Sequence, residues 1–507
     1  FYYTYRTDDS YFGRETIQGG VPVAEARVIV IGPERLVFET KGFNNVNAGK
    51  DTVMNSKRIV TIVQKDIPGV EDEKYSNYKA NLKRVEFKLS YNLSRKEKGR
   101  LFTWNELAKR AYENYAGISD KEMKKVNSLI TDQGWEKLKG NDAAIVTGVE
   151  DYLKRNFSIS RNNRDASAEN LESVIKSKIS NHRGINRLFG AIFRQLNVGF
   201  EFVLCGSRDE YIIDKSFENW NNCENELLYF PKLKKYIAPT LLEMRYPLID
   251  PLWVNSYGIF CKGTTIGDFT TAIAEIKPIR GTDHNWSGSN IDAKLKLNAS
   301  MDTLIVESRL SYTGYSSIYY RARLYFGNAE QEQLLIKELA KYGTRSERII
   351  SSKLMNKELE NISDNKPLTL DLVVNASELV DRAGNKVLVK IGEVIGQQTE
   401  MYQEKPRQFS IDVAYPHILE RTIELIIPDG YKIRNADDLS ISRVYKENEQ
   451  VTMGFESVYK LEGNVLKVTV TEQYCNIGYP LSQYEDFKKV INAAADFNKV
   501  TLVLEPK

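Results

Sequence analysis

Alternating hydrophobic and polar positions dominate the first hundred residues. Runs such as 27–31 and 59–63 are rich in valine and isoleucine, and glycine- or proline-containing turns separate them. This pattern is typical of β-strands joined by short turns. The pattern ends in the polar stretch 95–99. We therefore predict a β-rich N-terminal module over residues 1–98.

Helical periodicity follows this module. Thr103 begins a capping-box pattern, and a helix is predicted over 168–179. Between 184 and 198 the apolar residues recur at spacings of three and four, which places them on one helix face. Helices followed by short antiparallel strands predict an α+β domain over residues 99–270. The strands are expected at 200–205, 227–230 and 235–237.

The β pattern returns in the second half of the chain. It predicts two further β-rich modules, over residues 271–390 and 391–507. One helix is expected to interrupt the first of them, and the second should end in a helix followed by a strand. These elements are expected at 329–342, 483–495 and 500–504. The fold class is therefore α+β multidomain.

The amino-acid composition argues against several classes of function. Hydrophobic residues make up 42% and charged residues 27% of the 507 residues, the balance of an ordinary globular protein of several domains. Lys plus Arg (71) nearly equals Asp plus Glu (68), and no long basic run is present, which argues against nucleic-acid binding. No transmembrane segment of ~20 apolar residues is predicted. The chain opens on an alternating strand, so we expect a signal peptide or lipid anchor to lie upstream of it.

The cysteines do not form a recognisable framework. Cys205, Cys223, Cys261 and Cys475 are too few for a disulfide scaffold, and their spacing fits no zinc ribbon or finger. One bridge among the first three is conceivable. Cys205 lies in an alternating apolar run, where a free cysteine usually acts as a small buried hydrophobe.

Stretches at both ends of the chain match one known pattern. They are Tyr3-Thr4-Tyr5, Val21-Pro22-Val23, Phe102-Thr103-Trp104, 409–416, 427–431 and Tyr479-Pro480. The chain thereby resembles Gram-negative, Bacteroidota-type envelope proteins in which a transglutaminase-like domain lies between β-rich domains of unknown function. The resemblance implies a papain-like α+β core and β-sandwich-like C-terminal modules. It also implies that the N-terminal module lacks its first strands here.

The resemblance also locates three catalytic positions. Family members place a nucleophilic Cys at the start of the core helix, a basic His at the start of a strand and an Asp before Pro-Thr after a later strand. The matching residues here are His182, Glu226 and Ala238, the last in Ile237-Ala238-Pro239-Thr240. A neutral imidazole cannot replace a thiolate in acyl transfer, and a triad works as a unit. The resemblance thus implies a degenerate triad and a pseudoenzyme.

Two kinds of enzyme remain as alternatives. A cysteine-dependent transglutaminase- or protease-like enzyme could use Cys223 or Cys205 with a histidine base, and Cys223, in a polar turn, is the cysteine to test. The candidate bases are His182, His284 and His417. A metal-assisted hydrolase could use His182 and Glu226 as ligands. The simpler interpretation of His182 is a residue at a helix start, and we predict no cofactor and no metal site.

Tyrosine and arginine concentrate at 312–315 and 319–323. These residue types are enriched at binding hot spots, which would suit a partner surface, although packing within alternating strands and at their edges is the favoured explanation. The resemblance favours a non-catalytic binding or scaffolding protein of the cell envelope, periplasmic or outer-membrane-associated. Its partner would be a protein of an outer-membrane assembly, with peptide or glycan as other candidates.

Overall fold

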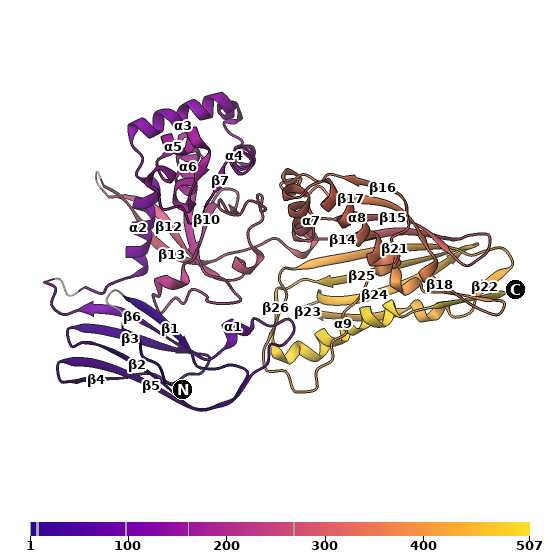
Figure 1. The fold of residues 1–507 in the computed structure, drawn as a ribbon, viewed down its shortest axis with the longest axis horizontal. Helices are drawn as coiled ribbons and strands as arrows, with labels where there is room; N and C mark the ends of the chain where they lie inside the picture. The colour runs from indigo at the N-terminus through magenta and orange to yellow at the C-terminus, as the bar shows by residue number, and fades with distance from the viewer. Residues whose placement is uncertain (1, 7–9, 97–98, 161, 267–268) are drawn as a thin grey trace. The chain divides into compact units, whose positions relative to one another are not determined.

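The chain forms two compact units, Phe1–Gly281 and Thr282–Lys507, in a computed structural model that describes residues 2–6, 10–96, 99–160, 162–266 and 269–507. Each unit combines helices with mainly antiparallel sheets, so the protein is a multidomain α+β protein, as predicted (Figure 1). Among the described residues, no helix is long and apolar enough to cross a membrane.

Two three-stranded sheets build the first part of unit 1, with the orders β1-β6-β3 and β2-β5-β4. Strand β6 alternates polar and apolar residues, and Val85 on it joins Val60 and Ile62 of β5 in a small core. The polar residues Arg84, Glu86, Lys88 and Ser90 of this strand are buried as well. The elements are β1 (Phe12–Thr16), β2 (Val23–Pro33), β3 (Leu36–Phe43), β4 (Lys50–Met54), β5 (Lys57–Ile67), α1 (Tyr78–Asn81) and β6 (Arg84–Asn92).

Helices pack against a five-stranded sheet, β11-β10-β9-β12-β13, in the second part of unit 1. The helices are α2 (Trp104–Ala116), α3 (Asp120–Gln133), α4 (Asp142–Asn156), α5 (Leu171–Ser177) and α6 (His182–Gln195). The strands are β9 (Glu201–Cys205), β10 (Asn225–Phe230), β11 (Lys235–Ile237), β12 (Tyr257–Ile266) and β13 (Phe269–Pro278), with a short pair, β7 (Ser158–Ile159) and β8 (Ile179–Ser180), beside them.

The periodicity predicted α6 correctly, and its apolar face is buried in the core of this domain. The predicted capping residue Thr103 accepts a hydrogen bond from the Glu106 N–H at 3.2 Å, which stabilises the start of α2. The helix expected at 168–179 is shorter, because Lys178 adopts a left-handed conformation that ends α5.

Unit 2 is built on one eight-stranded sheet, β16-β17-β15-β14-β21-β25-β24-β23. Strands β14 and β21 are parallel neighbours, so strands from the ranges 271–390 and 391–507 pair in one sheet. The elements of the first half are β14 (Ser289–Leu297), β15 (Leu304–Tyr312), α7 (Gly314–Phe326), α8 (Ala329–Thr344), β16 (Ile349–Met355), β17 (Leu368–Ala376), β18 (Val380–Ala383) and β19 (Lys386–Val389).

The rest of unit 2 completes this sheet and adds a smaller one. The elements are β20 (Ile411–Asp412), β21 (His417–Ile426), β22 (Tyr431–Ile433), β23 (Ile441–Glu447), β24 (Gln450–Glu462), β25 (Val465–Tyr474), β26 (Gly478–Tyr479), α9 (Tyr484–Asn498) and β27 (Leu502–Pro506). The smaller sheet has the order β18-β19-β27-β22, and α9 packs against β23 and β24. The predicted final helix and strand are therefore present.

Helix α7 was not predicted. Its sequence is rich in tyrosine, which favours strands, but Tyr315, Ile318 and Arg321 lie three residues apart and are buried together. Arg321 donates to the backbone oxygens of Glu358 and Lys366 at 2.5 and 2.6 Å. Tertiary packing thus overrides the strand preference of these residues.

Candidate functional site

His182 begins helix α6. The side chain of Asn181 accepts a hydrogen bond from the Gly184 N–H at 2.9 Å and so caps the helix. Gly184 allows the helix start to lie close to the preceding chain, because a Cβ atom there would stand 2.0 Å from the carbonyl oxygen of Ala168. The His182 imidazole at this helix start is half-buried.

Glu226 lies at the second position of β10, opposite Leu204 of β9. Its carboxylate accepts hydrogen bonds from the Tyr115 hydroxyl on α2 and from Asn186 Nδ2 on α6. The same Asn186 amide donates to the carbonyl oxygen of His182 at 2.9 Å. We call Tyr115, Asn186 and Glu226 the Glu226 cluster. Through Asn186 it joins the predicted base position to the start of the predicted nucleophile helix.

The electrostatics of the Glu226 cluster follow from burial. Burial raises the pKa of the Glu226 carboxyl group, although the hydrogen bond from Tyr115 opposes this effect. Burial and the neighbouring Glu226 hold the pKa of the Tyr115 hydroxyl well above its usual value, so this hydroxyl keeps its proton and remains a donor. The cluster therefore joins the buried Tyr115 and Asn186 to the half-buried Glu226 through hydrogen bonds, while among the described residues the Asn186 amide oxygen has no hydrogen-bond partner.

Ala238 directly follows β11, whose Ile237 pairs with Leu228 of β10. It therefore lies beside β10, the strand that carries Glu226. Its side chain is fully buried. Its methyl group can neither accept a hydrogen bond nor orient a base. The structure thus places the three predicted positions at the start of α6, on β10 and directly after the neighbouring strand β11.

Sequence reasoning missed Tyr115 and Asn186. Asn186 offered one signal, since it is a polar residue one helical turn after His182 on a face that is otherwise apolar. Tyr115 offered none, because α2 meets β10 only in the folded protein.

The cysteines are free thiols in this structure, so the conceivable bridge among Cys205, Cys223 and Cys261 is not formed. Burial raises the pKa of all three thiols, to about 12 for Cys261. At neutral pH they are protonated and weakly nucleophilic. Cys223, the predicted candidate, is half-buried and packs against the core of unit 1.

The other predicted histidines lie in unit 2. His284 opens a short 3-10 turn, and His417 begins β21 with its Nδ1 atom 2.9 Å from the carbonyl oxygen of Tyr415. Burial lowers the pKa of His417. Within the described ranges, no group of three or more His, Cys, Asp or Glu side chains is arranged to hold a metal ion.

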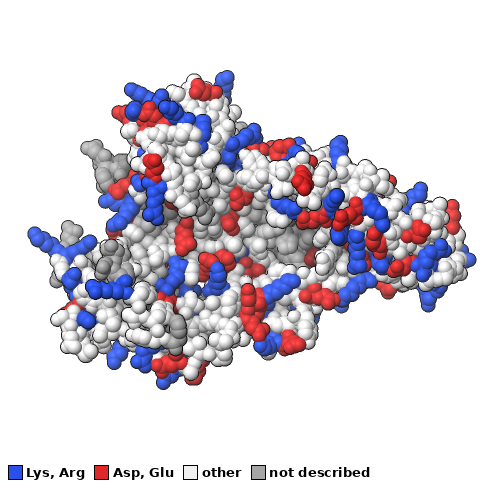
Figure 2. Space-filling view, in the orientation of Figure 1, with Lys and Arg blue, Asp and Glu red and all other residues white. Residues whose placement is uncertain are grey.

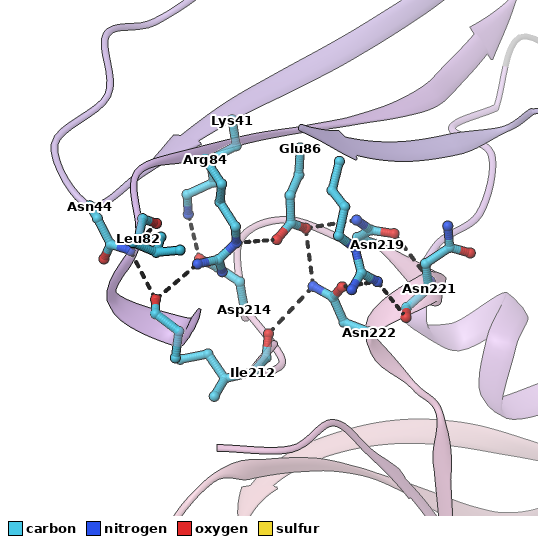
Figure 3. A network of polar contacts seen from close by, with 12 residues as sticks. Lys41, Asn44, Leu82, Arg84, Glu86, Ile212, Asp214, Asn219, Asn221 and Asn222 are labelled. Atoms are coloured by element: carbon cyan, nitrogen blue, oxygen red, sulfur yellow. Dashed lines mark hydrogen bonds and ion pairs between the residues drawn. The ribbon is translucent and has the colours of Figure 1, made fainter. Parts of the chain in front are cut away.

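The loop that connects β9 to β10 is tied to strand β6. Glu86 of β6 is fully buried and accepts from Arg84 Nε at 2.9 Å, from Asn219 Nδ2 at 2.7 Å and from Asn222 Nδ2 at 3.0 Å (Figure 3). On the same face of β6, Lys88 forms an ion pair with Glu218 at 2.6 Å. We call this set of contacts the β6 lock.

Further contacts extend the β6 lock. Arg14 stacks on the Tyr211 ring at 3.5 Å and donates to the carbonyl oxygen of Asn221 at 2.8 Å, and Lys41 pairs with Asp214 at 2.6 Å. The loop that leads to Cys223 and Glu226 is thus held by the sheet β1-β6-β3.

The tyrosine- and arginine-rich segment is partly exposed. Tyr312 and Arg321 are buried, whereas Tyr319 is 62% and Phe326 58% exposed, and Leu334 of α8 is exposed as well. The half-buried Arg323 lies 5.4 Å from the centre of the Tyr319 ring and is paired with Glu338 at 2.8 Å. We call these exposed residues of α7 and α8 the hairpin patch. Elsewhere, basic and acidic side chains are interspersed over the face seen in Figure 2.

Residues 388–504 match a domain of unknown function with a solved structure (DUF3858), so a DUF3858 domain is present. The chain is also similar to a crystal structure of a "putative protease" from Parabacteroides distasonis. The TM-score is 0.54, over 98% of this chain and 76% of that chain, with 11% sequence identity. At this identity the likeness shows the fold alone. No curated protein matches the chain in sequence.

Proposed function

We propose that this chain is a non-catalytic binding or scaffolding protein of the bacterial cell envelope, with a degenerate transglutaminase-like core. The observation that carries the proposal is the Glu226 cluster. The carboxylate at the base position is engaged by Tyr115 and Asn186 rather than by a nucleophile. With an imidazole at 182 and a methyl group at 238, no position keeps the group that acyl transfer requires.

The name given to the Parabacteroides protein favours one alternative, a cysteine-dependent protease. In this chain the candidate nucleophile would be Cys223, and burial raises the pKa of its thiol. A protonated thiol is a poor nucleophile, because the thiolate is the reactive form. This electrostatic argument supports the non-catalytic proposal over the protease.

The partner that we propose is a protein of an outer-membrane-associated assembly, on the periplasmic side. The hairpin patch is the surface proposed for it, because exposed Tyr319 and Phe326 beside Arg323 combine residue types that dominate binding hot spots. Tyr319 and Phe326 are seven residues apart on α7 and so lie on the same face of this helix, two turns apart.

Affinity purification of the tagged chain from envelope extract tests this proposal. We expect one protein partner to be retained in near-stoichiometric amount. The variant Tyr319→Ser/Phe326→Ser should no longer retain this partner, because the two substitutions remove the aromatic contact area. The variant Cys223→Ala should retain it, because no thiol chemistry is involved. Recovery of the chain alone and monomeric would overturn the scaffold proposal, and loss of binding in Cys223→Ala would favour the enzyme.

A further inference from the structure

A hollow of about 530 Å³ lies beside the start of the inner strand β9 in unit 1, and no residue of the Glu226 cluster lines it. It exists because β9 is short. Strand β9 begins at Glu201, and Cys261 is the last residue of β12 that pairs with it. Strand β12 continues beyond Cys261 without β9 beside it. The end of α6, the loop after it and Tyr112 of α2 form the remaining walls.

Aromatic side chains line this hollow. Phe200 and Phe202 lie edge to face with ring centroids 5.2 Å apart, and Tyr112 lies against Gly263. A Cβ atom at Gly263 would stand 3.1 Å from the Tyr112 ring, so the glycine allows the ring to lie close to the strand. These rings offer flat apolar surfaces of the kind that stack on other rings.

Charged side chains at the rim give the hollow a positive bias. The acidic residue, Glu201, is paired with Lys277 at 3.4 Å, and Lys262 is paired with Glu275 at 3.0 Å. Arg194 donates to the carbonyl oxygen of Ala116 at 3.1 Å. In the part of the chain that the structure describes, no carboxylate forms an ion pair with Arg194. One uncompensated guanidinium therefore stands beside the aromatic walls.

We propose that this hollow binds a small monoanion with a flat apolar body, such as an aromatic carboxylate. The ring of the ligand stacks against Tyr112 and Phe200, and its carboxylate pairs with Arg194, whose planar fork suits a carboxylate. Apolar walls with a few convergent polar groups are the usual composition of small-molecule sites. If the hollow held only water and were no binding site, it would show no preference for an anion over a neutral molecule.

Saturation-transfer NMR on the full chain, with indole-3-acetate and its neutral amide as probes, tests this site. We expect transfer to the indole ring of the acetate and at least tenfold weaker binding of the amide. Arg194→Gln should weaken binding of the acetate at least tenfold, and Tyr112→Ala should reduce binding of both probes.

The matched control is Arg183→Gln, an exposed arginine near the opposite end of the same helix, and it should bind as the unaltered chain does. Absence of transfer, equal binding of the two probes, or an Arg194→Gln variant that binds like the control would each overturn the proposal. Because neither Cys223 nor the hairpin patch takes part, this result is independent of the proposed scaffold function.

Discussion

Replacing Lys154 with methionine should destabilise unit 1 by about 3–5 kcal/mol, because the change leaves a buried carboxylate without its partner. Lys154 on α4 is 1% exposed and donates to Glu150 at 2.7 Å and to the carbonyl oxygen of Met244 at 2.8 Å. Glu150 in turn accepts from the Tyr246 N–H at 2.6 Å. Chemical denaturation followed by circular dichroism would measure the change.

The double variant Glu150→Gln/Lys154→Met should recover much of the lost stability, since glutamine removes the charge and still accepts from the Tyr246 N–H. Lys121→Met is the control, because Lys121 forms an exposed ion pair with Glu172 and should change the stability by less than about 1 kcal/mol. Equal effects of Lys154→Met and Lys121→Met would contradict the prediction.

The same lysine predicts a pH dependence. Burial lowers the pKa of Lys154 to about 8 in the folded chain, whereas the pKa of a lysine in an unfolded chain is ~10.4. Between these values the unfolded chain holds the proton that the folded chain has released. Stability therefore rises with pH in this window, and Lys154→Met should lack that rise.

Replacing Glu86 with leucine should destabilise unit 1 by about 3–5 kcal/mol through the β6 lock. The change leaves the Arg84 guanidinium and the amides of Asn219 and Asn222 buried without their shared acceptor. Hydrogen exchange should also accelerate in the loop 206–224, since its anchor on β6 is lost. Glu25→Leu on β2, where Glu25 forms an exposed ion pair with Arg27, should leave both measurements nearly unchanged. Unchanged exchange in the loop would show that β6 does not hold it.

Helix α6 and the strands around it were predictable because their apolar residues recur at the helical and strand periods, and those of α6 share one core with alternate residues of β9. Helix α7 was not, since its tyrosines favour strands and only packing against 3-10 turns and neighbouring strands decides its conformation. Strand β6 shows another limit. The alternation of polar and apolar residues in β6 predicts that one face of the strand is exposed to solvent. Glu86 and Lys88 lie on that face, but the loop between β9 and β10 buries them.

The roles of His182, Glu226 and Ala238 were inferred from resemblance and stay predictions. The structure places His182 at the start of α6, Glu226 on β10 and Ala238 directly after β11. What these residues contact was not predictable, because the partners of Glu226 come from α2 and α6, 111 and 40 residues away in sequence. Hydrogen-bond partners across such separations are set by the tertiary fold.

The central claim is that the core lacks a reactive nucleophile, and thiol labelling of Cys223 tests it most directly. The folded chain is treated with iodoacetamide at pH 7.5, and each cysteine is quantified by peptide mass spectrometry beside glutathione as a reference thiol. We predict that Cys223 stays unmodified while glutathione reacts completely, and that it reacts once the chain is unfolded, because burial keeps its thiol protonated. Stoichiometric labelling of Cys223 in the folded chain would contradict the claim.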